Sequence, residues 1–292
     1  MQSNQACSDP KSDLVRLFME RSGIAAPQDS PEQVITGLVE RTTQGKRVSG
    51  NGQRIQRFLD KRNIVSIEFV RDADYDGMIE PAGSTFSSGF KMRLKSDASE
   101  SRARFTVAHE ACHTFFYEFV PEIKFRLHET DDIEEHLCNV GAAALLVPSA
   151  SLRARSKALP ICLDSLDRLA QEYAVSLPMM LLRLRSLGLW KCQLSSWHRT
   201  VSGEFVLDRL YGGRKVEWKW HDMSVLERIW ASNEPVFETG FVYSEIRGAR
   251  AYQPIAYHAR KSNSGVSVLW GAGINRAALA YPLLESAHRA KK

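Results

Sequence analysis

The clearest pattern of hydrophobic and polar positions lies between residues 104 and 117. Drawn as a helix, this stretch has wide apolar faces formed by Phe105, Ala108, Cys112, Phe115 and Phe116. Ser99 or Ser101 can cap its start, and Pro121 stops any continuation. The pattern therefore predicts a buried helix.

A second stretch of helical periodicity covers residues 131–148. Its apolar residues recur at helical spacing, at Ile133, Leu137, Val140, Ala144 and Val147. Asp131 and Glu134 form a candidate cap pair at its start, and Pro148 marks its end. Small residues at 141–144 would let this helix lie close to another one.

The N-terminal part of the chain predicts further helices and a small sheet. Helices are expected at 12–23, 30–45 and 53–62, strands at 64–70 and 89–94, and a turn at 72–77. We expect residues 1–12 to be a disordered tail. With the two helices above, these elements predict one mostly helical domain with a small sheet over residues 13–150.

A basic connector is predicted at 149–160, and a helix-turn-helix-like segment within residues 151–195. Asp164 or Ser165 starts its first helix, and Ser176 caps the second. The segment is either a DNA-reading motif or a helical hairpin packed on the domain at 13–150.

The charges of this segment favour the packed hairpin. Its second helix carries Arg183 and Arg185, whereas the first carries the acidic residues Asp164, Asp167 and Glu172. A surface that binds duplex DNA needs a denser stripe of Lys and Arg. Only weak contact with DNA is expected here.

The remaining residues, 196–292, predict a separate α/β domain. Strands are expected at 204–208, 237–244, 251–259 and 264–273, with helices near 224–230 and 277–287. The fold class of the whole chain is therefore α+β.

Composition indicates a soluble cytoplasmic protein. The chain of 292 residues has a net charge of +5, and it contains no apolar run of the roughly 20 residues that cross a bilayer. The five cysteines are irregularly spaced, which indicates reduced thiols rather than a disulfide framework. The mildly basic charge permits weak contact with nucleic acid but does not demonstrate it.

The candidate chemistry lies in the first predicted helix, which contains His109-Glu110-Ala111-Cys112-His113. Side chains four residues apart share one face of a helix, so His109 and His113 can bind the same metal ion. Glu110 lies one position round and can reach a water on that metal. The alternative is a pair of hydrogen-bonded histidines in a core helix without metal.

A hydrolytic zinc site needs a third protein ligand and an open position for water. Glu135 in the second predicted helix is the proposed third ligand, and Asn139, four residues later, can orient a ligand. Glu134, about a hundred degrees round that helix, is the nearest competitor, and His136 is a weaker one. The position six residues after His113 is a phenylalanine, which excludes the zinc class with a third histidine there.

These two helices together resemble the ImmA/IrrE family of metallopeptidases. That family has Arg-Phe-Thr-x-Ala-His-Glu-x-x-His in one helix and Glu-x-x-Ala-Asn-x-Phe-Ala-Ala-x-Leu-Leu-Met-Pro in another. The chain departs from this pattern at Cys112, Cys138, Gly141 and Val147, where the family has mostly Gly, Ala, Phe and Met. A thiol beside a metal-binding histidine also adds a site of oxidation.

The resemblance implies a site, a cofactor and a class of function. His109, His113 and Glu135 match the family's metal ligands, and Glu110 matches its catalytic base. The metal would be Zn²⁺, with Mn²⁺ as an in vivo alternative. The substrate would be a helix-turn-helix repressor whose cleavage switches on genes for the response to DNA damage, radiation and desiccation, or genes of mobile elements. Residues 196–292 would form a GAF-like sensory domain.

In the expected mechanism, zinc lowers the pKa of a bound water to about 7, and Glu110 accepts its proton as the water attacks a peptide carbonyl. Tyr117, His128 and His136 are candidates for stabilising the oxyanion, and an edge strand beside the metal helix can hold an extended substrate. Two rival classes are a DNA-binding regulator with a structural metal site and a ligand sensor with a degenerate peptidase. The intact Glu110 argues against the second.

Overall fold

The computed structural model describes residues 10–44, 51–124, 132–212, 219–220, 223–246, 249–262 and 265–271. The chain divides into two compact units, Met1–Pro148 and Ser149–Lys292. The predicted segments 151–195 and 196–292 therefore share one unit. Residues 1–9 of the tail expected at 1–12, His128 and the helix expected at 277–287 lie outside the described residues. The expected tail is wrong at residues 10–12, which are helical.

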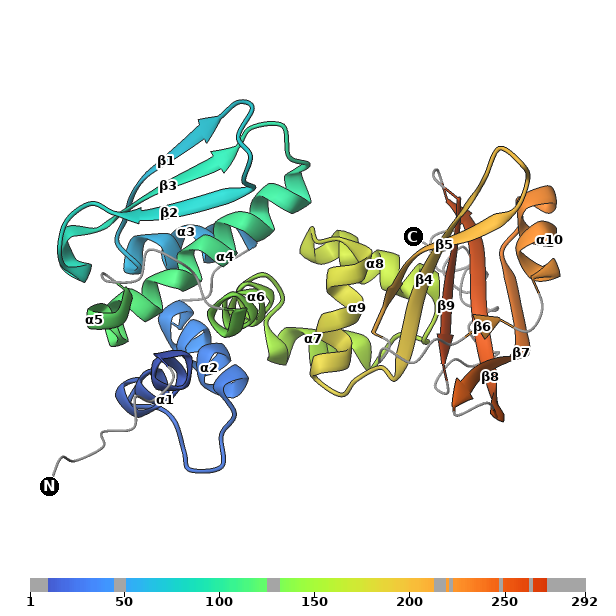
Figure 1. Cartoon of the computed structure of the whole chain (residues 1–292), viewed down its shortest axis with the longest axis horizontal. Coiled ribbons are helices and arrows are strands. Elements are labelled where there is room, and N and C mark those ends of the chain that lie inside the picture. The colour runs from blue at the N-terminus through green and yellow to red at the C-terminus, as the bar shows by residue number, and fades with distance from the viewer. Residues whose placement is uncertain are drawn as a thin grey trace, which may run out of the picture. The chain divides into compact units, whose positions relative to one another are not determined.

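The first unit is mostly helical, with one small sheet (Figure 1). Its elements are α1 (Pro10–Arg21), α2 (Pro31–Thr43), α3 (Asn51–Lys61), β1 (Ile64–Val70), β2 (Gly77–Pro81), η1 (Phe86–Ser88), β3 (Phe90–Lys95), α4 (Glu100–Phe119), α5 (Pro121–Lys124) and α6 (Asp132–Leu146). The helices and strands predicted before residue 148 are present within a few residues of their expected bounds. The strand β2 was not predicted, because its apolar residues Met78 and Ile79 are adjacent and do not alternate.

The sheet has the order β1-β3-β2, with β3 parallel to β1 and antiparallel to β2. Phe90, Met92 and Leu94 alternate along β3 and are buried. The sheet lies beside α4, which contacts β2 and β3 (Figure 1). The strand β2 is therefore an edge strand of the sheet, and it runs next to α4, the helix that contains His109 and His113.

Arg62 joins the end of α3 to α4. Its side chain is buried and donates hydrogen bonds to Thr114 Oγ1 at 2.7 Å and to Glu118 Oε2 at 2.6 Å. Its guanidinium also lies 4.0 Å from the ring centroid of Phe115 and 4.7 Å from that of Phe86. Lysine could not replace Arg62 here, because its ammonium group is not planar and cannot stack between two rings while donating hydrogen bonds in fixed directions.

The second unit begins with three helices, α7 (Ser149–Ser156), α8 (Leu163–Tyr173) and α9 (Leu177–Ser186). The basic connector predicted at 149–160 is wrong in part, because α7 occupies most of it. Cys162 caps α8 by accepting a hydrogen bond from Ser165 N, so the helix starts before the predicted Asp164 or Ser165. Ser176 caps α9 as predicted, with its hydroxyl bonded to Met179 N.

An antiparallel sheet of order β5-β4-β9-β8-β7-β6 completes this unit. Its strands are β4 (Cys192–Arg199), β5 (Phe205–Tyr211), β6 (Lys219–Trp220), β7 (Val236–Ile246), β8 (Ala249–Ser262) and β9 (Gly265–Gly271), and α10 (Ser224–Ser232) lies between β6 and β7 in sequence. The strands β4 and β6 were not predicted. The unit is mixed α and β, and the GAF-like assignment stays a prediction.

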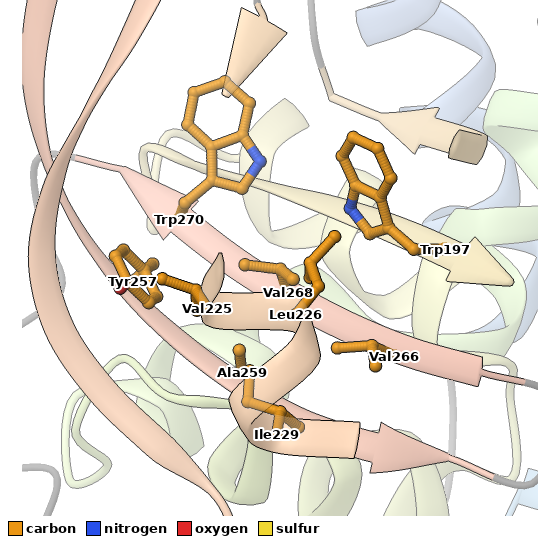
Figure 2. Close-up of a cluster of buried hydrophobic side chains, with 9 residues drawn as sticks. All are labelled: Trp197, Val225, Leu226, Ile229, Tyr257, Ala259, Val266, Val268 and Trp270. Carbon is orange, nitrogen blue, oxygen red and sulfur yellow. The ribbon is translucent and has the colours of Figure 1, made fainter. Parts of the chain in front are cut away.

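The two faces of the sheet pack against different helices. One face and α10 form a core cluster of Trp197, Val225, Leu226, Ile229, Tyr257, Ala259, Val266, Val268 and Trp270 (Figure 2). On the opposite face of β8, His258 Nδ1 accepts a hydrogen bond from Leu163 N at 3.1 Å, and Arg260 pairs with Asp164 and Asp167. This alternation along one strand places α8 across the sheet from α10.

No single helix in the described ranges is both long and apolar enough to cross a membrane. The bent pair α6 and α7 together meets the same criteria of length and composition.

We predict that Arg62→Ala lowers the free energy of unfolding by about 3 kcal/mol or more. The substitution removes the hydrogen-bond donor of Glu118 and Thr114 at a site with limited access to water. Arg16→Ala is the matched control, since the Arg16–Glu20 pair is exposed and contributes less than about 1 kcal/mol. Denaturant unfolding of both variants measures the difference. Equal losses would show that the Arg62 contacts add no stability.

Candidate metal centre

His109, His113 and Glu135 converge at one point between α4 and α6. The Nε2 atoms of the two histidines lie 3.1 Å apart, and the Glu135 carboxylate lies 3.1 Å from His109 Nε2 and 3.5 Å from His113 Nε2. Ligand atoms about 2.0–2.1 Å from a tetrahedral metal are separated by about 3.3 Å. The three donor atoms therefore have the spacing of one metal ion's ligands.

The other ring nitrogen of each histidine has an oxygen partner. His113 Nδ1 lies 2.6 Å from Glu134 Oε1, and His109 Nδ1 lies 3.1 Å from Asn139 Oδ1. Both oxygens accept hydrogen bonds, so in the neutral imidazoles each Nδ1 carries the proton and each Nε2 presents a lone pair. Three electron-pair donors thus face one another, an arrangement that a cation between them stabilises.

This geometry separates the candidates for the third ligand. Glu135 faces the Nε2 atoms, whereas Glu134 contacts the Nδ1 edge of His113, on the far side of that ring. His136 is exposed and its Nε2 lies 3.3 Å from Glu32 on α2. The carboxylate of Glu134 is buried against His113, and Asp131, its expected cap partner, lies outside the described residues.

Glu110, the predicted general base, is buried in the same helix. Burial raises the pKa of its carboxyl group, and the carboxylates of Glu135 and Glu134 act in the same direction, while His113 and His109 act against it. A carboxylate with a raised pKa is better matched to taking a proton from water.

Gly77 at the start of β2 is a feature of the site that sequence reasoning missed. A Cβ atom at this position would lie 2.3 Å from Thr106 Cγ2 and 2.9 Å from both Cγ and Oε1 of Glu110. The edge strand therefore passes directly against the Glu110 side chain because residue 77 is glycine. The signal in the sequence is a glycine at the end of a turn, which alone does not indicate a close approach.

Cys112 and Cys138 are fully buried free thiols. Burial raises the pKa of Cys112 to about 12, so the reactive thiolate is scarce at neutral pH. The predicted oxidation site beside the metal ligands is therefore disfavoured. Instead, the Cys112 side chain packs closely against Gly141: a Cβ atom added to Gly141 would lie only 2.7 Å from Cys112 Sγ.

Tyr117, a candidate for stabilising the oxyanion, packs its ring against Phe90, with centroids 5.2 Å apart. Burial raises the pKa of its hydroxyl group, and the charges of Glu134 and Glu80 act in the same direction. Tyr117 therefore stays a neutral hydrogen-bond donor, and its role stays a prediction.

The arginines of the helix-turn-helix-like segment are engaged within their own unit. Arg183 is buried and donates to Ser149 Oγ at 2.9 Å, and Arg185 donates to the Cys192 carbonyl at 2.6 Å. The two arginines that were candidates for contact with the DNA backbone thus attach α9 to neighbouring parts of its own unit. The hairpin therefore belongs to the C-terminal unit, and the expected packing on the domain at 13–150 is wrong in this respect.

A second group of ligand-type side chains, Cys162, Asp164 and His258, lies in the other unit. Each of these side chains already has a partner: the Cys162 thiol caps α8, Asp164 pairs with Arg260, and His258 accepts from Leu163 N. Burial also lowers the pKa of His258. The group therefore serves to attach α8 to β8.

Residues 81–185 match the peptidase family model described as the IrrE N-terminal-like domain. The chain contains an IrrE N-terminal-like domain. This confirms the family resemblance, and the match includes α4 and α6, which carry the converging side chains. The IrrE N-terminal-like domain belongs to a metallopeptidase family, which implies a divalent metal.

A Mycobacterium tuberculosis transcriptional regulator of known structure is similar to the chain with a TM-score of 0.48 and 12% sequence identity, covering 93% of this chain and 96% of that chain. No curated protein matches the chain in sequence.

Cys112 and Gly141 give a test of how α4 and α6 pack in this domain. We predict that Gly141→Ala destabilises the protein by about 1–3 kcal/mol, because the added methyl group overlaps the Cys112 thiol. Adding Cys112→Ala should recover much of that loss. Thermal unfolding of both single variants and the double variant gives the coupling energy, and additive effects would refute the contact.

Proposed function

We propose that the chain is a cytoplasmic zinc-dependent endopeptidase of regulatory type, with His109, His113 and Glu135 as metal ligands. The observation that carries this proposal is the convergence of their three lone-pair atoms beside the buried Glu110. The metallopeptidase family match supports it. A structural zinc site would have four closed protein ligands, often cysteines, and the buried Cys112 thiol instead packs against Gly141.

Each residue around the proposed site has a separate role in peptide hydrolysis. When bound, the metal would supply an acidified water and a Lewis acid for the peptide carbonyl. Glu110 accepts the proton of the attacking water and transfers it to the leaving amine. Asn139 Oδ1 accepts a hydrogen bond from His109 Nδ1, which keeps the ring turned toward the metal position.

The edge strand β2 supports a polypeptide substrate. Its backbone pairs with β3 on one side only, and its first residue, Gly77, touches Glu110. An extended segment added along the other side would bring a peptide bond close to the base. This arrangement favours cleavage within an extended segment of a protein.

The substrate class follows from the family resemblance. A helix-turn-helix repressor encoded with this chain is the first candidate, and its cleavage would derepress genes of a stress response or of a mobile element. The C-terminal unit, proposed to be GAF-like, would sense the signal that starts cleavage.

Wild-type protein and Glu110→Gln, each incubated with co-encoded helix-turn-helix repressors, test the proposal. Both should bind about one zinc per chain, and only wild type should cut, since loss of a general base costs about 100-fold or more in rate. Metal removal with a chelator should abolish cleavage and zinc addition should restore it. Metal bound without cleavage by wild type would refute the peptidase proposal, and absence of metal would refute the ligands.

Gly77→Ala tests the role of the edge strand. We expect this variant to retain zinc but to lose at least about tenfold in cleavage rate, because the new methyl group displaces Glu110 or β2. Gly52→Ala is the matched control, since a Cβ there meets nothing within 4 Å. Unchanged cleavage by Gly77→Ala would show that the close approach is unimportant for catalysis.

A further inference from the structure

Glu134 is a buried carboxylate that the proposed chemistry does not use. Its side chain is 1% exposed, and its Oε1 lies 2.6 Å from His113 Nδ1, whose own side chain is 4% exposed. It lies in the first turn of α6, one residue before Glu135. Ionised carboxylates are rarely buried this completely unless a cation or a proton donor compensates them.

The favourable position of an acid near a helix N-terminus does not account for Glu134. That effect needs no contact and acts on exposed side chains as well, as Glu100 in the first turn of α4 illustrates with an 86% exposed side chain. Glu134 is instead directed at one nitrogen of one ligand.

The two histidines are held in unequal ways. His109 is held by the neutral amide of Asn139, an exposed residue at 3.1 Å, and His113 by the buried carboxylate of Glu134 at the shorter distance of 2.6 Å. A carboxylate that accepts a hydrogen bond from Nδ1 makes the opposite nitrogen a stronger electron donor and fixes the ring orientation. Its negative charge also offsets a divalent cation bound on the other side of the ring.

We propose that Glu134 is a positioning residue of the metal centre, which holds His113 with Nε2 directed at the metal and increases the metal affinity of the site. This inference rests on the proposed metal ligands and deepens their assignment. In this role Glu134 acts on the metal position through His113 and not as a ligand itself.

The test measures zinc affinity by competition with a chromogenic chelator, on the full chain, for wild type, Glu134→Gln and Glu134→Ala. We expect affinity to fall by about 10- to 100-fold in Glu134→Ala and by less in Glu134→Gln, which keeps an acceptor oxygen but loses the charge. Glu100→Gln is the matched control for an acid in the first turn of a helix, and it should leave the zinc affinity unchanged.

A second readout separates positioning from folding. In the zinc-loaded wild type, nitrogen-correlated NMR of the histidine side chains should show His113 with its proton on Nδ1, hydrogen-bonded and slow to exchange. Glu134→Gln, whose shape is nearly that of wild type, keeps the test valid if Glu134→Ala fails to fold.

The outcomes distinguish this inference from the proposed function. Wild-type zinc affinity in a folded Glu134→Gln and Glu134→Ala, or a wild-type His113 with its proton on Nε2, would overturn the role of Glu134 and leave the peptidase proposal standing. Failure of wild type to bind zinc would overturn both. Reduced affinity together with the Nδ1 proton would support the inference, whatever the substrate is.

Discussion

The close packing of α4 against α6 is the constraint on which the candidate site depends. The two helices carry all the converging side chains, and Gly141 of α6 packs closely against Cys112 of α4. A larger side chain at 141 would push α6 away and would separate Glu135 from the histidines. The departures from the family pattern at 112 and 141 compensate each other, since a larger residue on one helix meets the smallest residue on the other.

Acidic side chains are concentrated in the first unit near the contact between α4 and α6. Glu110, Glu134 and Glu135 place three carboxylates close to two histidines, and burial raises the pKa of Glu110 further. Such a concentration of acidic groups is costly without a cation. The carboxylates that destabilise the site in the absence of metal therefore suit it to bind a divalent cation, next to a general base whose pKa is raised.

The second unit uses its charges for internal cohesion. Arg183 and Arg185 hold α9, and His258 and Arg260 hold the start of α8 against the sheet. Side chains engaged in this way are no longer available to a nucleic-acid backbone. These contacts favour a structural role for the helix-turn-helix-like segment within this unit.

The sequence by itself predicted the periodic helices, the cap at Ser176 and the candidate residues at 109, 110 and 113, because helical spacing and metal-ligand chemistry are local properties. It did not determine β2, which lacks alternation, or α7, whose residues are mostly polar. Only the tertiary structure distinguishes Glu134 from Glu135, since both lie in one turn and the packing of α4 sets which carboxylate lies near which histidine nitrogen. The role of Gly77 was likewise decided by packing, because close contact between distant segments leaves no local pattern.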